Sequence, residues 1–323
     1  MRMVKLLVLA LTLAAAGTQA NAQGSFKPNG PVTITVPYAA GGPTEGLMRP
    51  LAPQLQALWG QPVIIDNRPG ANGTIGVQYF AGRPGDGQSL LFHITALIQN
   101  VALYKNLPYD PVRDLVPVLL LGRQNNALVV PKDSPYKTVQ ELVAAIKANP
   151  GKFAYGSFGN GSTTHIYGQL FANAIGVDIP HLSFKGEGPV LTEILAGRLH
   201  FSFTSAASAA VRAKEGSMRV LAQTGPIRTK FFPDVPTLAE SGYPQFELTG
   251  WWGIFMPAGT PKALRDQIAA DIRTTLRQPD IQARLDSTAL APTDSSPDQV
   301  LAEIKQETAQ WIKLTKQFNI SLD

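Results

Sequence analysis

Short apolar runs alternate with helical patterns along most of the chain. Residues 32–36 are a β-branched run that predicts a strand, residues 37–43 hold two prolines and two glycines that end it, and leucines recur at helical spacing at 47, 51, 55 and 58. Gly41 and Gly42 have no β-carbon to keep a ligand from the backbone, and the first N–H groups of the helix point into that gap. This corner suits a small anion such as a carboxylate. The alternative is an ordinary tight turn that binds nothing.

The same pattern continues after the first helix. Residues 63–65 predict a second strand, 66–73 a second glycine loop, 74–81 a helix, and 90–92 a third strand that ends before Thr95. Strands that alternate with helices indicate a parallel sheet, in which ligands bind beyond the carboxyl ends of the strands. We therefore expect all these polar loops at one edge of the sheet.

A second corner follows further along. Apolar runs at 115–122 and 127–130 predict two more strands, and a short strand at 153–155 leads into a loop of glycines and hydroxyl residues at 156–165, then a helix. Two such corners facing each other would clamp a ligand. Residues 218–224 predict a strand that returns to the first half of the molecule. The crossovers near 123–127 and 222–226 would then serve as a hinge.

The N-terminal residues have the three-part pattern of a secretory signal peptide. Arg2 and Lys5 precede an apolar run over 6–16, and Ala20-Asn21-Ala22 follows. The apolar run is too short to span a membrane. We predict cleavage after Ala22, which leaves an exported, soluble mature protein. The absence of cysteine excludes disulfides, thiolate metal sites and a lipid-modified cysteine anchor.

Charge and motifs exclude several function classes. The chain has 28 basic and 23 acidic residues, and removal of Arg2 and Lys5 with the signal peptide leaves 26 − 23 = +3. The basic residues form no cluster, so we expect no nucleic-acid partner. The four histidines are not at metal-ligand spacing, and no Gly-x-Ser-x-Gly motif occurs. We expect no cofactor, no metal and no catalytic residues.

Several motifs together resemble one known family. They lie at 36–42, 60–63, 67–71, 86–91, 107–111, 159–162 with His165, 184–186, 232–240 and 257–261. In order and spacing they resemble the substrate-binding proteins of tripartite tricarboxylate transporters, also called Bug receptors, of the Gram-negative periplasm. The resemblance implies an α/β type II periplasmic binding protein, with two α/β lobes, a ligand cleft between them and two crossover segments.

The resemblance also implies how the chain is divided and what it does. Residues 23–123 and 225–323 would form lobe 1, and residues 124–224 lobe 2. The protein would capture a small organic acid in the periplasm and deliver it to membrane permease subunits. The acid could be a monocarboxylate, a dicarboxylate, an amino acid or an aromatic acid. Reporting to a membrane sensor, or a secreted α/β hydrolase, are the alternatives, and a monomer is expected.

The candidate ligand-binding residues come from both corners and from other strand ends. They are Tyr38, Ala39, Gly42, Thr44 and Glu45, then Ser157, Gly161, Ser162 and Thr163, and finally Thr95, Thr204 and Ser205. Glu45 stands where the family commonly has aspartate, and would receive a ligand amino group, organise water or simply stabilise the helix N-terminus. Lys185 would offer a positive charge to the ligand or lie at the surface. Trp251 and Trp252 are expected at the lobe boundary, or as an aromatic wall of the pocket.

Overall fold

The computed structural model describes residues 25–322 of the chain. The predicted signal peptide, residues 1–22, lies outside the described residues. Within the described part, no helix is long and apolar enough to cross a membrane.

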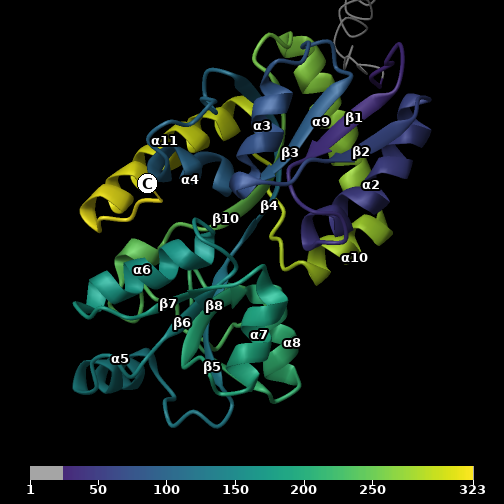
Figure 1. Cartoon of the computed structure of the whole chain (residues 1–323). Coiled ribbons are helices and arrows are strands. Elements are labelled where there is room, and N and C mark those ends of the chain that lie inside the picture. The colour runs from purple at the N-terminus through teal and green to yellow at the C-terminus, as the bar shows by residue number, and fades with distance from the viewer. Residues whose placement is uncertain (1–24, 323) are drawn as a thin grey trace, which may run out of the picture.

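Within residues 25–322, ten strands form two five-stranded sheets, one in each half of the molecule (Figure 1). The first sheet has the order β2-β1-β3-β10-β4, with β1 Val32–Val36, β2 Val63–Asn67, β3 Ser89–Ile94, β4 Leu115–Gln124 and β10 Gly250–Pro257. The second has the order β7-β6-β8-β5-β9, with β5 Asn126–Pro131, β6 Tyr155–Ser157, β7 His181–Ser183, β8 Phe201–Ser205 and β9 Met218–Gln223. In both, three parallel strands are joined to a fourth that runs antiparallel to its neighbours. Below, the first and second lobes mean these sheets with the helices packed on them.

The helices lie against the faces of the sheets. The first lobe carries α2 Pro43–Trp59, η1 Ala71–Gly73, α3 Thr74–Ala81, α4 Ala96–Leu103, α9 Lys262–Leu276, α10 Pro279–Ser287 and α11 Pro297–Gln317. The second lobe carries α5 Val139–Ala148, α6 Thr163–Ile175, α7 Glu187–Leu195 and α8 Ala206–Lys214. A 3-10 turn, η2 Pro244–Phe246, precedes β10. Helix α3 has the bounds that the sequence pattern predicts.

The leucine spacing of α2 is explained by its packing. Leu47, Leu51 and Leu55 are fully buried in one apolar cluster with Val32 and Ile34 of β1. Burying each such side chain contributes about 1.5–3 kcal/mol. This anchoring fixes the N-terminus of α2 directly beyond the carboxyl end of β1, which is where the first predicted corner lies.

The chain passes from one sheet to the other within a single residue, Asn125, between β4 and β5. The strand predicted to return to the first half does not do so: β9 pairs with β5 in the second sheet, where Ala127 faces Gln223. The prediction was wrong because an apolar run does not specify which strand it will pair with. The return comes later, at β10.

Residues 225–249, between β9 and β10, pack on the second lobe. The ring of Phe246 stacks on that of Phe203 at a centroid distance of 5.6 Å, and the Leu238 N–H donates to the Gln223 carbonyl at 2.8 Å. Trp311 of α11 also lies near the ring of Tyr167 in α6, at 6.1 Å. The predicted division at residues 123–124 and 224–225 stays a prediction. The contacts above join residues 225–249 and helix α11 to the second lobe.

Candidate functional site

A cavity of about 820 Å³ lies between the two lobes. Its walls come from the loops after β1, β2 and β3 in the first lobe and after β6, β7 and β8 in the second, so the carboxyl ends of the parallel strands of both sheets face it. The junction of β4 and β5 and the start of β10 complete the walls through Gln124, Asn126, Gly250, Trp251 and Trp252. The two predicted corners therefore do face each other across one space.

Among the described residues, six α-helices begin at this cavity. The residues at their N-termini that line it are Gly42 and Thr44 at α2, Gly73 at α3, Thr95 and Ala96 at α4, Ser162 to Thr164 at α6, Gly186 and Glu187 at α7, and Ser205, Ala207 and Ser208 at α8. The N-terminus of a helix carries roughly half a positive charge and directs unpaired N–H groups outward. Together, these helix N-termini create a positive potential in the cavity by means of the backbone.

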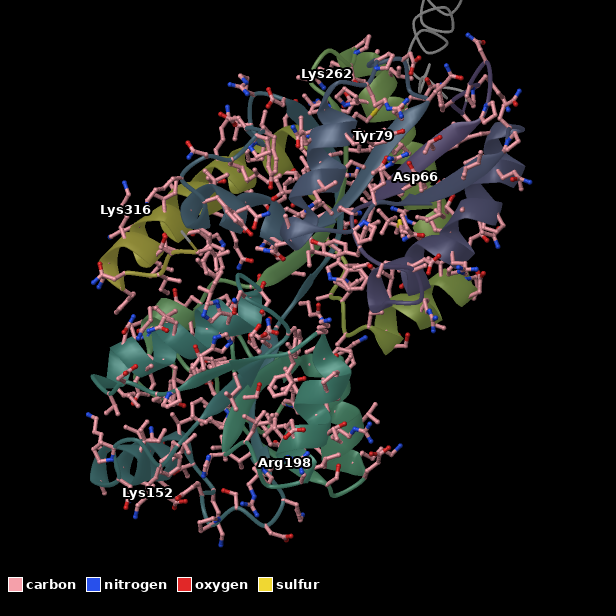
Figure 2. All side chains as sticks on the ribbon, in the orientation of Figure 1. Asp66, Tyr79, Lys152, Arg198, Lys262 and Lys316 are labelled. Carbon is pink, nitrogen blue, oxygen red and sulfur yellow. The ribbon has the colours of Figure 1, made fainter. Side chains whose placement is uncertain are left out.

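Formal charges are few at this site. Among the described residues that line the cavity, Lys185 and Glu187 are the charged ones. Lys152, Arg198 and Lys262, labelled in Figure 2, lie on the outer parts of the lobes and are exposed. The chemistry of the cavity is therefore that of backbone N–H groups, hydroxyls and amides, with one charge of each sign.

The first corner is held by contacts at its base. The side-chain amide of Asn67 donates to the Tyr38 carbonyl at 3.0 Å, and the Tyr38 ring lies edge-on to His93 at a centroid distance of 5.6 Å. Burial raises the pKa of Tyr38 well above its usual value, so the phenol stays neutral. Gly73 has a positive φ of 90°, and a β-carbon there would lie 2.7 Å from Nε2 of His93, so this turn requires glycine.

Thr95 lines the cavity, and its hydroxyl already takes part in a hydrogen bond within the protein. The Trp251 N–H donates to Oγ1 of Thr95 at 2.6 Å, and the indole N–H of Trp251 donates to Glu307 of α11 at 3.0 Å. Trp251 and Trp252 point to opposite faces of the sheet, into different apolar clusters, while both border the cavity. Both tryptophans therefore form part of the cavity wall, which was the alternative of the two predictions for them.

The second corner touches the first lobe directly. Ser162 caps α6 by accepting from the His165 N–H at 3.3 Å, and Oγ1 of Thr163 donates to Oε1 of Gln99 in α4 at 2.9 Å. The carbonyl of Gly161 accepts from the side-chain amide of Asn72 at 3.0 Å. Two hydrogen bonds therefore cross between the lobes beside the N-terminus of α6.

Below this corner, two histidine rings are stacked. His165 and His181 lie 4.1 Å apart between ring centroids, and Nε2 of His181 is 2.7 Å from Oγ of Ser157. Burial lowers the pKa of His165, and burial together with the neighbouring His165 lowers the pKa of His181 to about 4. Both rings are therefore neutral at pH 7.

Eight of the twelve predicted site residues line the cavity. They are Tyr38, Ala39, Gly42, Thr44, Thr95, Ser162, Thr163 and Ser205. The other four do not. Oγ of Ser157 is hydrogen-bonded to His181, and the carbonyl of Gly161 accepts from the side-chain amide of Asn72. Thr204 donates its hydroxyl to Oε1 of Glu187.

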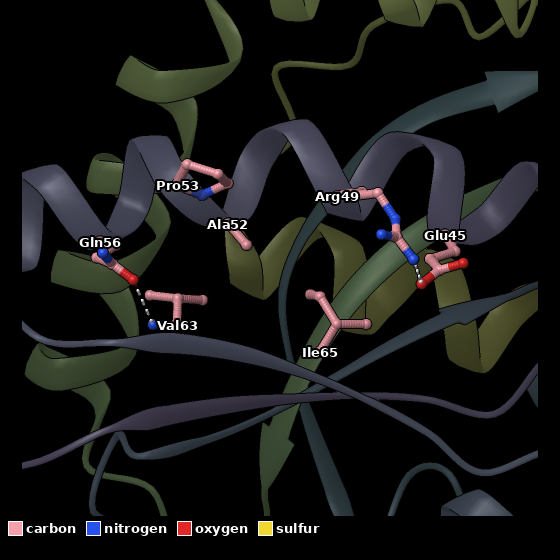
Figure 3. Close-up of a pocket in the computed structure, with 7 residues that line it drawn as sticks. All are labelled: Glu45, Arg49, Ala52, Pro53, Gln56, Val63 and Ile65. Carbon is pink, nitrogen blue, oxygen red and sulfur yellow. Dashed lines mark hydrogen bonds and ion pairs between the residues drawn. The ribbon is translucent and has the colours of Figure 1, made fainter. Parts of the chain in front are cut away.

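Glu45 lies in a different place from the one predicted. It borders a separate groove of about 380 Å³ between α2 and β2, where Oε1 accepts from Arg49 at 2.6 Å and Oε2 from the Gly41 N–H (Figure 3). These two hydrogen bonds, that from Gly41 first, hold the pKa of Glu45 below its usual value. Glu45 is the third residue of α2, and its carboxylate folds back on the loop that precedes the helix. This turns the carboxylate away from the cavity.

The sequence interpretation omitted several residues that line the cavity. Glu187 is the most informative, since its Oε1 accepts from Thr204 Oγ1, from the Ser205 N–H at 2.9 Å and from Ser205 Oγ at 2.9 Å. Glu187 follows β7 as the chosen residues follow β1 and β6, so position after a strand could have identified it; Lys185, which the sequence did suggest, lies two residues before it and also lines the cavity. Gln124 and Asn126 had no such signal, because they become part of the wall only through the crossing between the sheets.

Comparison with known proteins finds relatives that match nearly the whole chain. The family model described as "Tripartite tricarboxylate transporter family receptor" matches residues 47–320. A protein of Pseudomonas sp. strain P51, described as "UPF0065 protein in tcbD-tcbE intergenic region", is 32% identical over 315 residues, which cover 97% of this chain and 93% of that protein.

Two solved structures are also similar. Rpa4515 of R. palustris, solved with adipate, has a TM-score of 0.81 and 31% identity, covering 91% of this chain and 99% of that one. The periplasmic binding protein BugD has a TM-score of 0.79 and 30% identity, again with 91% and 99% coverage. With the two-lobed fold and the cavity between the lobes, these matches show that the chain belongs to the tripartite tricarboxylate transporter receptor family, a family of substrate-binding receptors.

Proposed function

We propose that this protein is a periplasmic solute-binding protein that captures a small organic carboxylate between its lobes and delivers it to a tripartite tricarboxylate transporter permease. The observation that carries the proposal is the meeting of six helix N-termini at a cavity whose described lining holds one cationic side chain, Lys185. Backbone N–H groups at such termini bind carboxylates without a charged clamp. The adipate in the similar Rpa4515 structure and the periplasmic description of BugD support it.

The binding groups follow from the geometry of the two corners. The α2 terminus has no side-chain cap, so the backbone N–H of Thr44 and the Thr44 hydroxyl are available to one carboxylate. Ser162 and Thr163 bring the N-terminus of α6, with its first backbone N–H groups, to the opposite wall. The lobes close by bending at the crossovers, where Asn125 separates the two sheets, and closure removes the ligand from water. The protein carries the acid and does not transform it.

Thermal unfolding of the mature protein, from residue 23, tests this proposal. The panel contains adipate, succinate, glutarate, malate, acetate, benzoate and several amino acids, after unfolding and refolding to remove any carried-over ligand. A ligand at about 100 times its Kd adds roughly 2.7 kcal/mol to the free energy of unfolding, which raises the midpoint by several degrees. We expect a saturable rise with at least one acid.

A pair of glycine variants shows whether the ligand occupies this cavity. Gly42 lines it with an ordinary φ and room for a β-carbon, so Gly42→Leu fills the space without backbone strain, whereas Gly82 is exposed at the end of α3 with open space around it. The midpoint rise should disappear in Gly42→Leu and persist in Gly82→Leu. A panel in which no acid raises the midpoint, or a rise that survives in Gly42→Leu, would contradict the proposal.

A further inference from the structure

Glu187 is the acidic side chain on the cavity wall, at the start of α7 in the second lobe. All three hydrogen bonds that it accepts end on Oε1, from the hydroxyl of Thr204 and from the backbone and hydroxyl of Ser205. Among residues 25–322, none donates a hydrogen bond to Oε2. One oxygen therefore fixes the carboxylate, and the other keeps its acceptor capacity.

The nearest cation along the chain does not neutralise this group. Lys185 precedes it by two residues and borders the same cavity, but no ion pair within 4.0 Å joins the two in the described structure. An uncompensated carboxylate would become costly when the lobes close and exclude water. A ligand made only of carboxylates would also be repelled at this wall, so the site calls for a positive group opposite Glu187.

We propose that Glu187 receives the ammonium group of an amino acid, whose carboxylate is bound at the helix N-termini. This inference rests on the proposed function for the carboxylate end and adds the chemistry of the other end. An ammonium supplies up to three donors and a full charge, and charge-assisted hydrogen bonds are roughly twice as strong as neutral ones. The two hydrogen bonds from Ser205 are sufficient to hold the receiving carboxylate in one orientation, which favours the binding of a zwitterion over that of its deamino analogue.

A purely structural role for Glu187 makes a different prediction. An acid at the first position of a helix stabilises that helix, and the bonds to Thr204 and Ser205 would simply join β8 to α7. The variant Glu187→Gln separates the two roles, because its amide oxygen still accepts from Thr204 and Ser205 while an NH₂ group replaces the free oxygen. Thr204→Val is the matched control: Thr204 does not line the cavity, so this variant weakens the junction and leaves the carboxylate in place.

The experiment is calorimetric titration at pH 7 with pairs of acids that differ only in the amino group. The pairs are aspartate and succinate, glutamate and glutarate, alanine and propionate, and phenylalanine and 3-phenylpropionate. For the pair that fits, the wild-type protein should bind the amino member at least about 10-fold more tightly. In Glu187→Gln the Kd of the amino member should rise by roughly 30-fold or more, while the deamino member binds as before or better. Thr204→Val should retain the wild-type preference.

The outcomes separate this inference from the proposed function. Binding of a deamino acid as tight as that of its amino partner, or equal weakening of both in Glu187→Gln, would overturn the role of Glu187 and leave carboxylate capture intact. Loss of the preference in Thr204→Val as well would assign the effect to the junction. If no acid of either kind binds, carboxylate capture itself fails, and the inference fails with it.

Discussion

The two hydrogen bonds that cross between the lobes beside the N-terminus of α6 give a sharp prediction about closure. Thr163 Oγ1 donates to Gln99 Oε1 at 2.9 Å, from α6 of one lobe to α4 of the other. If the lobes separate in the free protein, this bond forms only when they close on a ligand. Its free energy then contributes to binding and not to the folding of either lobe.

The magnitude follows from the burial of the two partners. Gln99 is fully buried, and its Nε2 has no hydrogen-bond partner in the described structure. Thr163→Val keeps the shape but leaves Oε1 of Gln99 without a donor in the closed form, which costs about 1–3 kcal/mol and raises the ligand Kd about 5- to 150-fold. Gln99→Leu removes both the acceptor and the unpartnered amide, so its cost should be smaller, about 0.5–1.5 kcal/mol.

The double variant carries the test. Replacing both partners removes the unsatisfied group, so its Kd should lie near that of Gln99→Leu, with a coupling between Thr163 and Gln99 as large as the cost of Thr163→Val, about 1–3 kcal/mol. Calorimetric Kd values for the acid that binds most tightly measure this coupling. Urea unfolding without ligand should give midpoints for the single variants that are similar to that of the wild-type protein. If the effects of the two single substitutions simply multiply in the double variant, the bond does not contribute to closure and the reasoning is refuted.

Two further predictions concern the second lobe. A β-carbon on Gly168 would lie 1.9 Å from a ring carbon of the fully buried Tyr155, so Gly168→Ala should lower the free energy of unfolding by about 3 kcal/mol or more, whereas Gly188→Ala, with open space around it, should change it little in urea unfolding. The pKa of His181, lowered from 6.5 to about 4, means that the unfolded chain binds a proton first as the pH falls. The stability that this ring provides is complete above about pH 6.5 and is lost toward pH 4. His181→Gln should therefore show a shallower decline of the urea midpoint over that range. An unchanged slope would show that the stacked pair of His181 and His165 is not the source of this pH dependence.

The sequence by itself determined the local structure and much of the site's position. The leucine spacing after Leu47 and the β-branched run before Pro37 are read within a window of a few residues, and the chain forms the expected strand, loop and helix there. Glycine loops after strands placed each corner at the carboxyl edge of its own sheet, because parallel strands present their carboxyl ends together. Eight of the twelve chosen residues reach the cavity for this reason.

Only the tertiary structure decided which partner each group would find. The strand at 218–223 joined the second sheet because β5 offered it an antiparallel edge there. Glu45 and Glu187 both lie in the first turn of a helix that follows a strand, yet Arg49 and the Gly41 N–H turn one away while Thr204 and Ser205 hold the other on the cavity wall. Hydrogen-bond partners and strand pairing depend on residues far away along the chain, whereas periodicity and turn chemistry are encoded between near neighbours.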